Sequence, residues 1–164
     1  MLIRHGANPN RTLDCILPGA AEHQFDEDSH NQLVRVVEDL LDLYNADVHH
    51  VLGPYSRPGL IHEAAAMQYP AMVRSLLNRG ALMNSQDGSG YTPLHLAVRT
   101  HSASVMIRLL EAGADLNARD DSGETPLYTA IDQHYGFGVE TLLSYGADPN
   151  TPGTMARHPF IELR

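Results

Sequence analysis

Pairs of leucines recur along the chain at a constant spacing, and a glycine follows each pair three residues later. The pairs and their glycines are Leu76-Leu77 with Gly80, Leu109-Leu110 with Gly113, and Leu142-Leu143 with Gly146. Successive glycines are 33 residues apart. Because leucine marks the buried face of a helix and glycine tolerates the left-handed backbone that ends one, the pattern predicts helices ending near Arg79, Ala112 and Tyr145.

A second pattern lies upstream of each leucine pair. It reads YTPLHLAV at 91–98 and ETPLYTAI at 124–131, with a weaker version, GLIHEAA, at 59–65. Threonine is suited to cap a helix, and proline to fill its first position, where no amide donor is needed. The sequence therefore predicts two helices in each 33-residue unit. Because one such unit cannot bury its apolar face alone, the units must stack.

The 33-residue period with its T-P-L-H-x-A signature resembles the ankyrin repeat. The resemblance implies an all-α fold, an ankyrin-type solenoid of stacked helix-turn-helix repeats joined by hairpin loops. The predicted organisation is 1–10 as the tail of a truncated repeat, 11–54 as a degenerate repeat with an acidic insertion, 55–87, 88–120 and 121–153 as repeats, and 154–164 as the start of a further truncated repeat.

The period is longer in the degenerate repeat. The string YNADVHH at 44–50 replaces the glycine string, and Asn45 lies 39 residues after Gly6, six more than one period. We place the excess in the acidic stretch 21–32, ahead of a helical run over 33–44. A solvated insertion is favoured there over a divalent-cation site, because the EF-hand spacing and its turn glycine are absent. Asn45 can replace glycine because asparagine tolerates the left-handed conformation.

The two ends of the chain carry hydrophobic residues that belong to half-repeats. These residues are Leu2, Ile3, Phe160, Ile161 and Leu163. Neither end shows the polar outer face of a capping repeat. We therefore expect a fragment of a longer array, with ends less stable than the centre.

Composition narrows the function classes. The formal net charge is −9, and all eleven cationic side chains are arginines. An acidic chain argues against non-specific nucleic-acid binding and against attraction to an anionic membrane surface. Cys15 is the single cysteine, so no internal disulfide can form, and neither a signal peptide nor an apolar run of membrane-spanning length is present. We expect an intracellular protein, cytoplasmic or nuclear.

The sequence offers no convergent catalytic chemistry. His62-Glu63 opens like a zinc-protease helix, but Ala66 stands where that motif needs a second histidine. The resemblance instead implies a structural hydrogen bond for His62 and His95, which occupy the histidine of the repeat signature. We predict a protein without catalytic activity, bound metal or cofactor, and without a small-molecule substrate.

The favoured function is a protein-protein interaction module that binds an unidentified partner protein through the concave surface of the hairpins and first helices. The resemblance points to the variable positions around each signature as contacts. They are Tyr55, Arg57, Met67, Ser89, Tyr91, Arg99, Thr100, Asp121, Glu124, Asp132 and Gln133. The alternative is a regulatory or targeting segment of a larger signalling or ubiquitin-transfer enzyme, with its catalytic domain outside these residues.

Charge is unevenly distributed among these contact positions. Arg57 and Arg99 lie in the earlier repeats, whereas Asp121, Glu124 and Asp132 lie in the last. The pattern favours a partner that presents its basic part to the 121–132 end.

Overall fold

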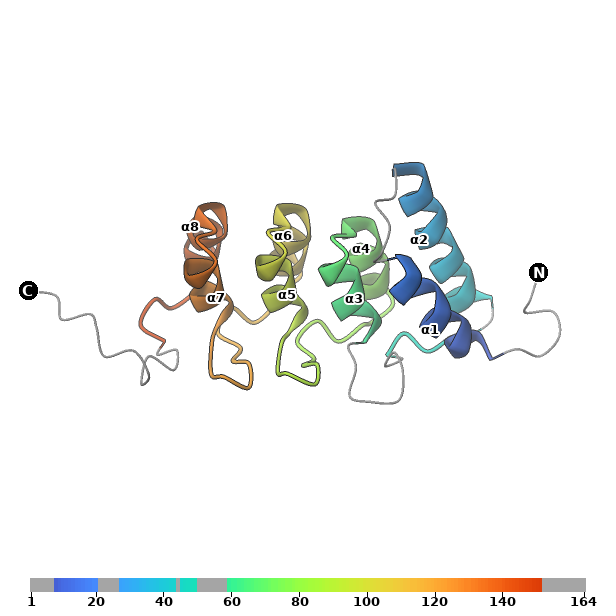
Figure 1. Cartoon of the computed structure of the whole chain (residues 1–164), viewed down its shortest axis with the longest axis horizontal. Helices are drawn as coiled ribbons and strands as arrows, with labels where there is room; N and C mark the ends of the chain where they lie inside the picture. Colours follow the sequence, from blue (N-terminus) through green and yellow to red (C-terminus); the bar gives the residue numbers. More distant parts are fainter. Residues whose placement is uncertain (1–7, 21–26, 44, 50–58, 152–164) are drawn as a thin grey trace, which may run out of the picture.

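The computed structural model describes residues 8–20, 27–43, 45–49 and 59–151, and in these ranges it contains eight α-helices and no β-strand (Figure 1). The helices are α1 (Pro9–Ala20), α2 (Glu27–Asp42), α3 (Leu60–Ala66), α4 (Pro70–Asn78), α5 (Pro93–Arg99), α6 (Ala103–Glu111), α7 (Pro126–Asp132) and α8 (Gly136–Ser144). They stack as consecutive pairs in one row, and loops project from the same side of α5 and α7 (Figure 1). This is the all-α solenoid that the sequence predicts.

The second helices end where the leucine-glycine pattern predicts. Arg79, Ala112 and Tyr145 are the C-cap residues of α4, α6 and α8. The glycine after each cap has a left-handed backbone, with φ between 85° and 95°. Alanine at these glycines would be strained whatever the free space around it, because its Cβ disfavours this conformation.

The first helices begin with the predicted threonine and proline. Thr125 accepts a hydrogen bond from the Tyr128 backbone N–H at 3.3 Å, and Pro126 opens α7. Pro93 opens α5 in the same way, after Thr92. The local chemistry of the signature therefore sets where each first helix starts.

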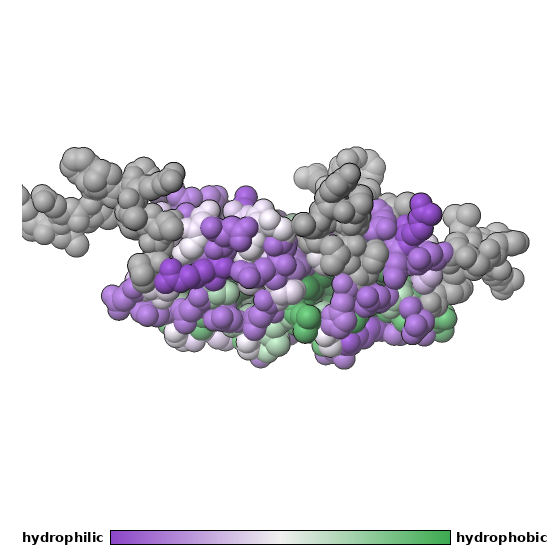
Figure 2. Space-filling view, turned by 90° about the horizontal axis from the view of Figure 1, so that it is seen from below, coloured by the Kyte–Doolittle hydropathy of each residue, from purple (hydrophilic) through white to green (hydrophobic). Residues whose placement is uncertain are grey.

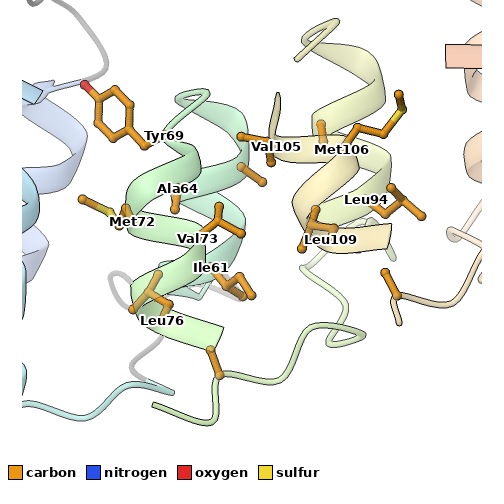
Figure 3. Packing of buried hydrophobic residues seen from close by; sticks show 14 of the residues in the cluster. Ile61, Ala64, Tyr69, Met72, Val73, Leu76, Leu94, Val105, Met106 and Leu109 are labelled. Atoms are coloured by element: carbon orange, nitrogen blue, oxygen red, sulfur yellow. The ribbon is translucent and has the colours of Figure 1, made fainter. Parts of the chain in front are cut away.

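Equivalent hydrophobic side chains from each repeat build one continuous core (Figure 3). Ala64, Ala97 and Ala130 are fully buried, and so are the leucines of the second helices, Leu76, Leu109 and Leu142. The small alanines let first and second helices approach closely, and the leucines fill the space between neighbouring pairs.

Burial stops at the last described repeat. Val98 is fully buried, whereas Ile131, one period later, is 53% exposed. Leu110 and Leu143 differ in the same way, at 6% and 43%. The exposed face is the one that a following repeat would cover in a solenoid. The hydrophobic residues expected to start such a repeat, and those expected at the N-terminal end, lie outside the described residues.

The N-terminal part departs from the predicted boundaries. Helix α1 starts at Pro9, because the Asn8 side chain accepts a hydrogen bond from the Asn10 N–H at 2.9 Å and caps it, so positions 9 and 10 are already helical. Helix α2 starts at Glu27 and ends at Asp42, so 27–32 is helical rather than inserted loop. Acidic residues in the first turn favour this start, since they complement the positive end of the helix dipole.

One hydrogen bond of the regular repeats recurs at this end of the chain. The Asn10 side-chain oxygen accepts from the Asp47 N–H at 2.9 Å, 37 residues away. The same bond joins Asn84 to Asp115 and Asn117 to Asp148, each over 31 residues. The 37-residue spacing at the N-terminal end exceeds the 31-residue spacing of the regular repeats by six, the number of extra residues in the degenerate repeat. Asn45 has φ 55°, the left-handed conformation predicted for it.

Across the described ranges, no helix combines the length and the apolar character needed to cross a lipid bilayer.

Candidate functional site

Each hairpin is held by an aspartate at its start. Asp87 Oδ1 accepts a hydrogen bond from the Tyr91 N–H at 2.9 Å, and Asp120 Oδ1 accepts from the Glu124 N–H at 2.8 Å. Tyr91 and Glu124 are thereby fixed at the base of their hairpins, just before α5 and α7. Both stand at equivalent positions of neighbouring repeats.

Neighbouring hairpins are also joined to each other. The Asp121 N–H donates to the Ser89 carbonyl at 3.1 Å, and Gln86 Nε2 donates to the carbonyls of Gly90 and Arg119 at 2.9 and 2.7 Å. Gly90 has φ 77°, and a Cβ there would lie 2.4 Å from the Asp121 nitrogen. Only glycine permits this approach, so the spacing between the two hairpins is fixed.

Four exposed or half-buried side chains stand at two equivalent positions of these repeats, and we call them the first-helix patch: Tyr91, Arg99, Glu124 and Asp132. Arg99, the last residue of α5, places its guanidinium carbon 4.5 Å from the centre of the Tyr91 ring. Asp132 ends α7 at the equivalent position of the next repeat. One repeat therefore carries a cation-π pair at these two positions, and the next carries two acidic residues, Glu124 and Asp132.

Burial and neighbouring charges both act on the Glu124 carboxyl. Burial raises the pKa of Glu124, the charges of Asp120 and Asp132 raise it further, and Arg99 lowers it. Asp120 is only 6% exposed, and its Oδ2 is buried without a hydrogen-bond partner in the part of the chain that the structure describes. Burial and the two nearby carboxylates thus disfavour the ionised form of Glu124.

The family model described as "Ankyrin repeats (3 copies)" matches residues 61–152, more than half of the chain. The chain belongs to the ankyrin repeat family. A comparison with curated proteins gives no match. Ankyrin repeats are in general protein-protein interaction modules and are typically not catalytic, so the family places this array in that broad class.

The other predicted contacts occupy two kinds of position in the ankyrin array. Met67, Thr100 and Gln133 are the C-cap residues of α3, α5 and α7, one period apart. Ser89 and Asp121 are exposed in the hairpins. Two further predicted contacts, Tyr55 and Arg57, lie outside the described residues. Viewed from the hairpin side, the array is mostly hydrophilic, with a hydrophobic area near its middle (Figure 2).

The histidines of the ankyrin signature are structural, as predicted. His95 Nε2 pairs with the Glu124 carbonyl at 3.1 Å, and its Nδ1 accepts from the Thr92 N–H at 3.2 Å. His62 Nε2 pairs with the Ser85 carbonyl at 2.9 Å. Burial lowers the pKa of both histidines. His62 Nδ1 lacks a partner among the described residues, because Gly59 stands where Thr92 supplies its hydroxyl one repeat later.

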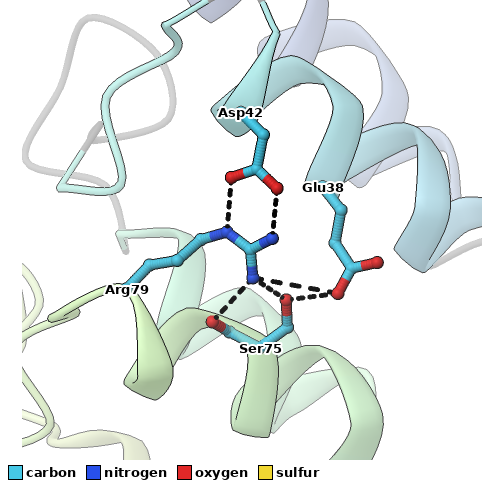
Figure 4. Close-up of polar contacts among 4 residues, drawn as sticks. All are labelled: Glu38, Asp42, Ser75 and Arg79. Carbon is cyan, nitrogen blue, oxygen red and sulfur yellow. Dashed lines mark hydrogen bonds and ion pairs between the residues drawn. The ribbon is translucent and has the colours of Figure 1, made fainter.

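A polar junction that the sequence pattern does not predict joins the degenerate repeat to the regular ankyrin repeats (Figure 4). Arg79 donates two parallel hydrogen bonds to Asp42, from Nε at 2.9 Å and from a terminal nitrogen at 2.6 Å. Ser75 donates to Glu38 Oε1 at 2.6 Å. The partners come from α2 and α4, 37 residues apart, and each contact involves residue types that do not recur at the equivalent positions of later repeats.

Within the described ranges, no three His, Cys, Asp or Glu side chains are grouped closely enough to hold a metal ion.

Proposed function

We propose that the ankyrin array binds a partner protein through the surface formed by its hairpins and its first helices, without a catalytic step of its own. The proposed contacts are Tyr55, Arg57, Met67, Ser89, Tyr91, Arg99, Thr100, Asp121, Glu124, Asp132 and Gln133. The observation that supports this surface best is the Tyr91–Arg99 pair, in which the guanidinium carbon lies 4.5 Å from the centre of the ring.

Tyrosine and arginine are the residue types that dominate binding energy at interfaces. Here they stand on a backbone that is already ordered, because Asp87 holds Tyr91 and the Asp121–Ser89 bond ties the two hairpins together. A partner therefore does not have to order this surface when it binds, which lowers the entropic cost of association.

The test is a selection of binders to the full chain from a displayed library of random peptides. Binders are then measured on a Tyr91→Ala/Arg99→Ala variant and on an Arg108→Ala control. Arg108 is half-exposed on the second helix α6 and pairs with Glu111 at 3.3 Å. We expect at least a tenfold affinity loss on the patch variant and no change on the control. Binders whose affinity is the same on the Tyr91→Ala/Arg99→Ala variant as on the wild type would place the binding surface elsewhere and overturn the proposal.

A further inference from the structure

We propose that the groove between α2 and α4 binds an aspartate or glutamate side chain of a polypeptide partner. The groove is formed by α2 and α4 rather than by the hairpins and first helices, so this inference goes beyond the proposed function and does not depend on it.

The groove has a volume of about 420 Å³ and lies between the facing sides of the two helices. It stays open because α4 presents the short side chains of Ala71 and Ser75 to it. The polar junction forms part of its lining: Arg79 donates two hydrogen bonds to Asp42, and Ser75 donates one to Glu38 (Figure 4). These contacts tie the two helices together, so the groove is formed before a partner binds.

Hydrogen-bond donors line both walls of the groove. Asn31 and Arg35 lie one helical turn apart on α2. Arg74 and Asn78 have the same spacing on α4. Both arginines are exposed, and among the described residues neither side chain has an ion-pair or hydrogen-bond partner. The two asparagine amides are equally unpartnered in that part of the chain, so each wall offers one guanidinium and one amide to the same space.

The acidic residue of the lining, Glu38, is already engaged. Its Oε1 accepts the hydrogen bond from Ser75 at 2.6 Å and lies 3.8 Å from a terminal nitrogen of Arg79. The remaining nitrogens of Arg79 are directed to Asp42, at 2.9 and 2.6 Å. The junction therefore satisfies its own charges and leaves the cations of the two walls without a counter-charge.

A carboxylate matches what the walls offer. A guanidinium presents its N–H groups as a planar fork that fits a carboxylate, and one anion between Arg35 and Arg74 would offset both cations. The basic region is short, because α2 carries exposed acidic residues on both sides of it, Asp28 and Asp39. A nucleic-acid strand, with a charge at every phosphate, would meet these carboxylates, whereas a single acidic side chain would not.

The test is a subtractive selection from a displayed library of random peptides. The immobilised full chain is the target, and an excess of a soluble Arg35→Gln/Arg74→Gln variant, the groove variant, removes peptides that bind elsewhere. Circular dichroism verifies that the variant is folded. We expect the surviving peptides to share an aspartate or glutamate at one position and to lose about tenfold or more in affinity on the groove variant.

The matched control is Arg11→Gln/Arg108→Gln, which removes two exposed arginines from α1 and α6, outside the groove. It should bind the surviving peptides as tightly as the wild type does. The single variants Arg35→Gln and Arg74→Gln should each lose part of the affinity, since the two walls share one anion.

A second measurement identifies the group that enters the groove. The shared acidic residue of a selected peptide is replaced by its amide, and both peptides are measured on the wild type and on the groove variant. We expect about a tenfold loss or more on the wild type and little loss on the groove variant. The same peptides should bind the Tyr91→Ala/Arg99→Ala variant unchanged, so this inference and the proposed function can fail separately.

Three results would overturn the inference. In the first, no peptide survives the subtraction, and in the second, the survivors share no acidic residue. In the third, a single-stranded oligonucleotide binds the wild type but not the groove variant, which would assign the groove to nucleic acid instead.

Discussion

Leu110 and Leu143 occupy the same position in successive repeats, and they provide a direct test of where stacking ends. Both are leucines near the end of a second helix. Leu110 is 6% exposed, whereas Leu143, in the last helix that the structure describes, is 43% exposed. Each leucine is replaced by alanine. Because the two residues have the same type and the same position in their helices, any difference between the variants reflects the difference in burial.

The two substitutions should differ by about 2 kcal/mol in the free energy of unfolding. Removing a buried leucine side chain costs about 3 kcal/mol, because the transfer energy is lost and a cavity is left. For Leu143 almost half of the side chain already meets water, and its removal opens a surface rather than a cavity. A cost of about 1 kcal/mol follows from the smaller area involved.

The assay is urea unfolding of the full chain, followed by far-ultraviolet circular dichroism, with amide hydrogen exchange to locate the destabilised helices. Leu110→Ala should speed exchange in both α6 and α8, whereas the effect of Leu143→Ala should be confined to α8. Equal losses of stability in the two variants would refute the reasoning. They would mean that Leu143 is covered in solution, and the hydrophobic residues after position 151, Phe160 among them, would be the first to test.

Three further predictions concern single contacts. Gly90→Ala should lower the unfolding free energy by about 2 kcal/mol or more, because its Cβ would collide with the Asp121 backbone. Gly113→Ala should lower it by about 1 kcal/mol, because a Cβ there meets open space. Equal losses of stability in the two variants would contradict the contact between the hairpins. Arg79→Ala should speed hydrogen exchange in α2 but not in α6, and unchanged α2 protection would show that the junction is dispensable. Because burial lowers the folded pKa of His62 and His95, the unfolded chain binds more protons below about pH 6.5, so stability should fall as the pH drops from 7.5 to 6. A His62→Gln/His95→Gln variant should flatten this slope, and an unchanged slope would exclude these histidines as its source.

The regular repeats could be predicted because the contacts that define them are local and recur in every repeat. The glycine caps, the threonine-proline starts and the histidine bonds each involve residues within one repeat or at its border with the next. Their spacing in the sequence is therefore their spacing in the fold. The family match over residues 61–152 covers this same region.

Helix α1 begins inside the segment 1–10, where the sequence predicts the tail of a repeat, because the run at 6–10 is compatible with two structures. The run at 6–10 reads like the run at 146–150, and both place a proline before an asparagine. In the later copy, positions 149 and 150 form a turn, whereas Pro9 and Asn10 open the helix α1. Asn8 and Pro9 also satisfy the requirements of a helix cap and a first helical residue, so the local chemistry alone does not choose between the two uses.

The chemistry of the first-helix patch depends on a choice that the sequence leaves open. The period places Arg99 one repeat before Asp132, and an ion pair between them would neutralise half of the acidic pair. In the structure the guanidinium lies on Tyr91 instead. An exposed cation-π contact and an exposed ion pair are each worth about 0.5–1 kcal/mol, so the two arrangements are nearly balanced. The repeat period therefore leaves open which of the two contacts Arg99 makes, and only the fold assigns its guanidinium to the tyrosine of its own repeat.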